Sequence, residues 1–247
     1  MESGKKQVFT EFERRAQLLR SYLKPDLRHN MEIIPSPFFI EIDGGTSSGK
    51  STVIRELDKF FKREGFRVLA PQEGPAVIRH IPRDTPEYNL RTGIYSLQMF
   101  IDFSWGHLYD LVIFERGVFD PLRWMEYWKA KGLLTEEEKS IIQNFFLLNA
   151  FTKKVDAAFF LVCDPQVAFE RETRFELSSK AGESTNPAAI KVASEQYRVL
   201  YERLSPAYPQ LVLVDTTKLT EIEMTQHITG IALNFLEERA LNSEKRG

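Results

Sequence analysis

Short apolar runs alternate with amphipathic segments along most of the chain. The apolar runs predict strands over 38–43, 67–70, 111–115, 158–163 and 211–215. Apolar residues at helical spacing predict helices over 92–107, 119–131, 135–155, 165–175, 188–204 and 221–241. Residues 71–91 contain four prolines and predict an irregular segment. Strands that alternate with helices predict a parallel sheet with helices on both faces.

The segment before the first predicted strand has a helical pattern of its own. Its apolar residues fall on one face and are Phe9, Phe12, Ala16, Leu19 and Leu23. We expect an accessory helix that packs on the main domain, and the alternative is an arm that binds a partner. The predicted organisation is therefore a helical extension over 1–36 and one domain over 37–247.

Composition narrows the classes of function. The 247 residues carry a formal net charge of −2, which does not favour general binding to nucleic acid or to membrane surfaces. Cys163 is the single cysteine, so no intrachain disulfide can form. No apolar run is long enough to cross a bilayer, and no apolar signal-peptide core follows Lys5 and Lys6. We therefore expect a cytoplasmic protein.

The most specific motif follows the first predicted strand. Residues 44–51 read GGTSSGKS and fit G-x-x-x-x-G-K-[ST] at every fixed position. Glycines let the backbone N–H groups turn inward, and the helix that follows, which ends at Gly65, adds its positive end. Lys50 can then reach the β- and γ-phosphates of a triphosphate. The expected phosphate-binding residues are Gly44, Gly45, Thr46, Ser47, Ser48, Gly49, Lys50, Ser51 and Thr52.

An acidic residue and an arginine stand together at the end of the third predicted strand. Glu115 lies beside the phosphate loop in a parallel sheet, so Glu115 and the Ser51 hydroxyl are candidate Mg²⁺ ligands. Arg116 can stabilise the charge of a transferring phosphoryl group. The alternative is a surface ion pair, which is common and weakly stabilising.

These two motifs resemble the deoxynucleoside kinase and thymidylate kinase group of P-loop kinases. IEIDGGTSSGKST resembles the first strand and P-loop of that group, and FERGVFD resembles its acidic-Arg element. The resemblance extends over 38–217. It implies a three-layer P-loop NTPase fold with a five-stranded parallel sheet in the order 2-3-1-4-5. It also implies ATP and Mg²⁺ as cofactors.

The resemblance also implies two catalytic elements. Deoxynucleoside kinases carry a glutamate as general base after the second strand, which makes Glu73 the candidate here, with Asp84 as the alternative. The Glu-Gly-Pro of this chain matches neither the Glu-Pro of that group nor the Arg-Glu-Pro-Gly-Gly of thymidylate kinases. A lid over about 170–187 would close Arg171 and Arg174 over the phosphates, and a charged helix face is the alternative.

Basic residues gather in the region expected to bind the acceptor. Arg79 and Arg83, with His80 and Arg91 nearby, suit a phosphorylated acceptor or form a solvated basic loop. Gln98 matches a base-binding glutamine of deoxynucleoside kinases by the resemblance. The aromatic residues of this region either stack on a base or belong to the core, and they are Phe100, Phe103, Trp105, Trp124 and Trp128.

The sequence thus predicts an ATP-dependent phosphotransferase that acts on a nucleoside or nucleoside monophosphate. A polynucleotide 5′-hydroxyl kinase and a nucleotide-binding regulatory protein with weak hydrolysis are the alternatives. Binding of nucleic acid is possible but not favoured by the charge. The apolar stretch Phe145–Phe151 is either core or an interface, so a homodimer is also possible.

Overall fold

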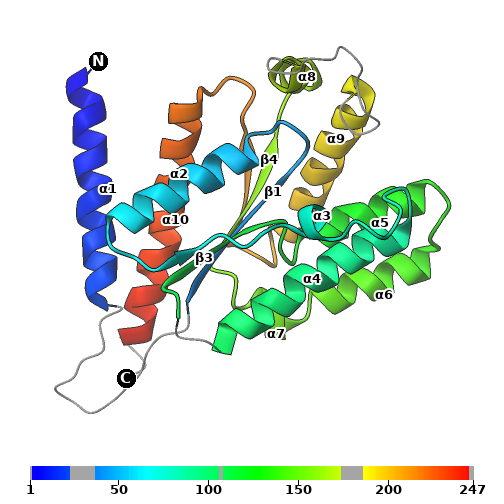
Figure 1. The fold of residues 1–247 in the computed structure, drawn as a ribbon, viewed down its shortest axis with the longest axis horizontal. Coiled ribbons are helices and arrows are strands. Elements are labelled where there is room, and N and C mark those ends of the chain that lie inside the picture. The colour runs from blue at the N-terminus through cyan, green and yellow to red at the C-terminus, as the bar shows by residue number, and fades with distance from the viewer. Residues whose placement is uncertain (1, 23–36, 106–107, 174–185, 245–247) are drawn as a thin grey trace.

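A computed structural model of the chain describes residues 2–22, 37–105, 108–173 and 186–244. Its centre is a five-stranded parallel sheet with the order β2-β3-β1-β4-β5 (Figure 1). The strands are β1 (Phe38–Gly44), β2 (Val68–Leu69), β3 (Leu111–Glu115), β4 (Ala157–Val162) and β5 (Leu211–Asp215). The predicted strand positions and the predicted order are confirmed, although β2 is shorter than expected.

Helices cover both faces of this sheet (Figure 1). On one face lie α2 (Lys50–Arg63) and α10 (Glu221–Glu244), with α1 (Glu2–Tyr22) packed outside them. On the other face lie α4 (Pro86–Trp105), α5 (Asp120–Ala130), α6 (Glu136–Phe146), α7 (Asn149–Thr152) and α9 (Pro187–Leu204). Two short helices, α3 (Gly74–Val77) and α8 (Pro165–Thr173), follow the carboxyl ends of β2 and β4.

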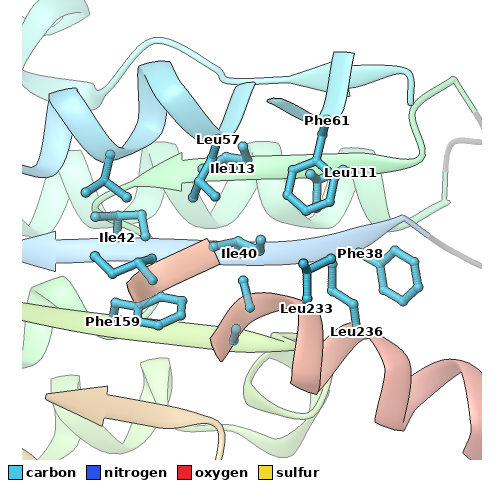
Figure 2. Close-up of a cluster of buried hydrophobic side chains, with 14 of the residues drawn as sticks. Phe38, Ile40, Ile42, Leu57, Phe61, Leu111, Ile113, Phe159, Leu233 and Leu236 are labelled. Carbon is cyan, nitrogen blue, oxygen red and sulfur yellow. The ribbon is translucent and has the colours of Figure 1, made fainter. Parts of the chain in front are cut away.

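The alternation of side chains along β1 divides the core into two layers. Phe38, Ile40 and Ile42 pack with side chains of α2 and α10, as Figure 2 shows. Phe39 points to the opposite face, where it packs with Phe100 of α4. Glu41 shares that second face, so a carboxyl group is buried where the pattern would otherwise place an apolar residue.

The N-terminal helix α1 packs against α10. Ala16 and Leu19 are fully buried in the layer formed by α2 and α10. Arg15 forms an ion pair of 2.7 Å with Glu237 at the outer edge of this contact. The helix begins at Glu2, earlier than the apolar pattern predicted. Its packing is that of an accessory helix rather than of a free arm.

Two predictions of helical segments were wrong in their boundaries. Residues 71–91 were expected to be irregular, but α4 begins at Pro86, because proline fits the first turn of a helix, where its missing N–H is not needed. The segment 135–155 was expected to form one helix, but it breaks at Leu147 and Leu148. Within the described parts of the chain, no helix is both long and apolar enough to cross a membrane.

Candidate active site

The loop between β1 and α2 has the geometry of a phosphate cradle. Gly44 has a φ of 150°, and a Cβ at this position would lie 2.4 Å from the carbonyl oxygen of Leu161. Gly49 has a φ of 102°, and Ser47 adopts the left-handed conformation with a φ of 54°. The first turn of α2 contains no acidic residue. No acidic side chain of the first turn therefore competes for the N–H groups of the helix, which suits an anion.

Lys50 lies inside this cradle. Its side chain is 6% exposed, and its Nζ donates to the carbonyl oxygen of Gly45 at 2.9 Å. The nearest carboxylate oxygen, Oε1 of Glu115, is 4.0 Å away. Burial and the nearby charge of Arg116 lower the pKa of Lys50. A buried ammonium with incomplete charge compensation is well suited to bind a phosphate group.

Two oxygen donors from different elements meet next to Lys50. Ser51 Oγ, on the first turn of α2, lies 3.2 Å from Oε2 of Glu115 at the end of β3. Hydroxyl and carboxylate oxygens are the donors that Mg²⁺ prefers, and Mg²⁺ in nucleotide sites takes its other ligands from phosphates and water. No group of three His, Cys, Asp or Glu side chains suited to a metal occurs in the described residues. The pair therefore fits a magnesium ion that arrives with a triphosphate.

A cavity of about 630 Å³ opens beside the cradle. Its walls come from the phosphate loop, from α8 and from the start of α10. Two of its side chains, Glu172 and Glu221, are acidic, and Glu172 accepts a hydrogen bond from Ser47 Oγ. The cavity is thus large enough for part of a nucleotide, and one carboxylate of α8 already contacts the loop.

Arg116 stands at the carboxyl end of β3 in an unusual conformation. Its φ is 63°, a left-handed value that costs a residue with a Cβ roughly 1–3 kcal/mol. Its Nε lies 3.6 Å from Oε2 of Glu73, the residue that directly precedes α3. Burial opposes the charge of this guanidinium, but the carboxylates of Asp120 and Glu73 outweigh burial and raise the pKa of Arg116. The structure thus brings together two of the predicted catalytic residues.

The structure describes one of the two arginines of the predicted lid, Arg171. Arg171 lines the cavity beside the phosphate loop, but its guanidinium donates to the carbonyl oxygens of Thr216 at 2.8 Å and Leu219 at 3.3 Å. It would have to exchange these bonds to reach a phosphate. Arg174 lies outside the described residues, as does most of the predicted lid.

The residues predicted to bind the acceptor do not line the cavity beside the phosphate loop. Arg79 and Arg83 are exposed and donate to backbone carbonyl oxygens of Ala76 and Pro75. Gln98 is an exposed residue of α4 and does not line the cavity beside the phosphate loop. The aromatic residues divide: Phe100 and Trp128 are core, whereas Trp105 is 78% exposed, and Phe103 and Trp124 are half-buried.

A buried polar network beneath the site was missed by sequence reasoning. Glu41 accepts hydrogen bonds from the N–H groups of Val118 and Phe119, and Asp120 accepts one of 2.7 Å from the hydroxyl of Tyr197. Asp43 is fully buried, and neither of its carboxyl oxygens has a hydrogen bond of ordinary geometry. The available signal was the pair of acids two positions apart in an otherwise apolar strand, which alternation places on one face.

The sheet order and the phosphate loop after its central strand together define the P-loop NTPase fold. No protein-family model matches the chain. A thymidylate kinase from Protochlamydia amoebophila (strain UWE25) is 25% identical over 225 residues, which cover 84% of this chain and 95% of the relative.

Solved structures of a deoxyadenosine kinase from M. mycoides share the fold. The structure with bound dATP has a TM-score of 0.54 and 16% identity, and it covers 80% of this chain and 100% of the kinase. The structure with the products dCMP and a flexible dCDP has a TM-score of 0.55 and 15% identity, and it covers 80% and 99%. The predicted resemblance to the deoxynucleoside kinase and thymidylate kinase group is confirmed.

Proposed function

We propose that this chain is an ATP-dependent kinase that transfers the γ-phosphoryl group to a nucleoside or nucleoside monophosphate. The observation that carries the proposal is the meeting of Arg116 and Glu73 beside the phosphate loop that holds Lys50. A carboxylate and a guanidinium beside that loop supply a base and a charge-stabilising group, both of which phosphoryl transfer to a hydroxyl uses. The similar thymidylate kinase and the structurally similar deoxyadenosine kinase are kinases by name.

Each group has a distinct proposed role. Lys50 and the N–H groups of the phosphate loop bind the β- and γ-phosphates, while Ser51 and Glu115 hold Mg²⁺. The metal, when bound, neutralises charge that develops between the β- and γ-phosphates. Arg116 stabilises the transferring phosphoryl group, and Arg171, with Arg174, completes the charge compensation when the lid closes.

Within this function, the Glu73–Arg116 pair favours a hydroxyl acceptor. A hydroxyl must lose a proton as it attacks phosphorus, whereas a monophosphate acceptor is already ionised. The two groups are 3.6 Å apart and share no hydrogen bond, so each can bind an acceptor hydroxyl. Arg79 and Arg83 bond to backbone carbonyl oxygens instead of converging with this pair. We therefore propose a nucleoside as the first acceptor to test.

The test is a transfer assay with γ-labelled ATP and Mg²⁺ against nucleosides, nucleoside monophosphates and a short 5′-hydroxyl RNA. Label on a nucleoside supports the proposal that the acceptor is a nucleoside. Label on a nucleoside monophosphate supports the kinase function but argues against Glu73 as a base. Label on the RNA would replace the small-molecule acceptor with a polynucleotide. ATP binding without any labelled acceptor would favour the regulatory alternative.

We also propose that the chain forms a homodimer in the cytoplasm, where ATP and Mg²⁺ are available. Exposed apolar side chains lie on one stretch of α4, at Ile94, Ile101 and Trp105, and on α6, at Ile141 and Phe145. Exposed apolar residues that gather on neighbouring helices are typical of an interface. A Trp105→Glu variant should shift the mass measured by light scattering from dimer to monomer, and a monomeric wild type would contradict this proposal.

A further inference from the structure

Glu41 is a buried carboxylate in the central strand of the sheet. It belongs to β1, it is 2% exposed, and Phe39 on the same face lies in an apolar core. A carboxyl group at such a position is costly unless hydrogen bonds compensate for the lost hydration. Its contacts therefore indicate what the chain gains from having an acid there.

Both oxygens of Glu41 bind the turn that follows Arg116. Oε2 accepts from the N–H of Val118 at 2.9 Å, and Oε1 accepts from the N–H of Phe119 at 2.7 Å. Gly117 packs directly on the carboxylate, because a Cβ there would lie 2.4 Å from Cδ of Glu41. One side chain thus satisfies two successive N–H groups and fixes the path of the backbone between them.

The residue just before this turn has an unfavourable backbone conformation. Arg116 has a φ of 63°, which is unfavourable for a residue with a Cβ. Its N–H donates to the carbonyl oxygen of Ile42 at 3.2 Å, and its carbonyl oxygen accepts from Ser96 Oγ at 2.7 Å. Without these two hydrogen bonds and those that Glu41 accepts from the turn, we expect the backbone to relax and to turn the guanidinium away from Glu73.

The neighbouring acid explains how Glu41 can remain a double acceptor. Burial raises the pKa of Glu41 and, more strongly, the pKa of Asp43 two residues later. Glu41 has two N–H donors, whereas Asp43 has no hydrogen bond of ordinary geometry. Burial and the charge of Glu41 thus favour the protonated form of Asp43, whereas the two N–H groups favour the charged form of Glu41.

We propose that Glu41 is a positioning residue for phosphoryl transfer, which acts by holding Arg116 in its left-handed conformation next to Glu73. This inference rests on the proposed kinase function. Since β1 continues from Glu41 directly into Gly44 of the phosphate loop, the same strand sets the position of both the phosphate-binding groups and Arg116.

Amide hydrogen exchange tests whether Glu41 holds the turn, and this measurement requires no phosphate acceptor. In Glu41→Gln the side chain has one acceptor oxygen and an NH₂ group, so one of the two N–H groups loses its partner. We expect exchange at Val118 and Phe119 to accelerate by roughly tenfold or more. The matched control is Asp156→Asn, a buried carboxylate that accepts from the N–H of Phe39 at the other end of β1. It should leave exchange at Val118 and Phe119 unchanged. Unchanged exchange in Glu41→Gln would overturn the proposal.

A double-mutant cycle separates positioning from a general structural role. We expect Glu41→Gln to lower kcat by roughly 10- to 100-fold while KM for ATP changes by less than about threefold. In the Arg116→Ala background the same change should have almost no further effect, because Glu41 acts through Arg116. An equal loss in both backgrounds would contradict the proposal.

Ser96→Ala provides a second variant in case Glu41→Gln does not fold. It removes only the hydroxyl that bonds the carbonyl oxygen of Arg116. We expect a smaller fall in kcat, roughly threefold to tenfold, that also disappears in the Arg116→Ala background. A loss that persists there would count against the proposal. If the wild type transfers phosphate to no acceptor, the proposed function and the role in transfer both fail, and the exchange result still decides whether Glu41 holds the turn.

Discussion

Glu73 Oε2 lies 3.6 Å from Arg116 Nε, close enough for an ion pair and too far for a hydrogen bond. The carboxylate precedes α3 and the guanidinium follows β3, so two separate strand ends supply the pair. Neighbouring parallel strands β2 and β3 bring these ends to one edge of the sheet. Both atoms are buried and lack a hydrogen-bond partner among the described residues, so we infer that an acceptor hydroxyl that enters this site would bind them.

Replacement of Glu73 by Gln tests the role of this carboxylate as a base. If the acceptor is a hydroxyl, kcat should fall by roughly 10²- to 10⁴-fold, while KM for ATP should hardly change. Asp84→Asn is the matched control, because Asp84 is the other candidate base and is exposed. A fall in kcat with Asp84→Asn and none with Glu73→Gln would transfer the assignment to Asp84.

Replacement of Glu172 by Gln should tighten ATP binding. The carboxylate of Glu172 lies in the cavity beside the phosphate loop and bonds Ser47, so it repels an incoming triphosphate. We expect Kd for ATP to fall by roughly tenfold, which corresponds to about 1.4 kcal/mol. Titration calorimetry measures this, with Glu170→Gln, an exposed residue of the same helix, as the control. Weaker binding in Glu172→Gln would mean that Glu172 supports the loop.

The N-terminal helix should contribute to the stability of the whole domain. Leu19 is fully buried against the core, so Leu19→Ala should lower the free energy of unfolding by about 2–5 kcal/mol. Leu18 is 47% exposed on the same helix, and Leu18→Ala should change the free energy much less. Denaturant titration of both variants distinguishes these effects. Equal, small changes would show that α1 is not part of the cooperative unit.

The pH dependence of stability should reveal the buried acid at the opposite end of the sheet. Burial raises the pKa of Asp156 from 3.8 to about 6, although the ion pair with Arg239 at 2.6 Å opposes the shift. A carboxyl with a raised pKa in the folded state stabilises the fold when protonated, so this contribution is lost as pH rises through about 6.

Comparison of the wild type with Asp156→Asn isolates that contribution. As the pH rises from 4 to 7, the unfolding free energy of the wild type should fall by about 2–3 kcal/mol relative to that of Asp156→Asn. Denaturant titrations at a series of pH values measure the difference. A difference that is independent of pH would show that Asp156 titrates alike in the folded and unfolded chains.

The phosphate loop could be predicted because its motif consists of consecutive residues, whereas the strand order was predicted from the resemblance to the kinase group. The motif from Gly44 to Ser51 is contiguous, and its position after a strand and before a helix determines its geometry. The pairing of Ser51 with Glu115 also followed from the rule that strand ends meet at one edge. Local pattern was sufficient for the loop, and the strand-end rule was sufficient for the pairing.

Features that depend on packing could not be predicted in the same way. The left-handed backbone of Arg116 results from bonds with Ile42 and Ser96, which lie on other elements. The burial of Glu41 follows from the position of the turn after β3, and an acid in an apolar strand does not specify its partner. The break after Phe146 has no glycine or proline to mark it.

The most direct test of the proposed kinase is γ-phosphate transfer to a nucleoside by the wild type and by Lys50→Ala. Lys62→Ala, which changes an exposed lysine of the same helix, is the control. We predict labelled nucleoside monophosphate with the wild type and with Lys62→Ala, and none above background with Lys50→Ala. Transfer by Lys50→Ala at the wild-type rate, or no transfer by the wild type to any nucleoside or nucleoside monophosphate, would contradict the account.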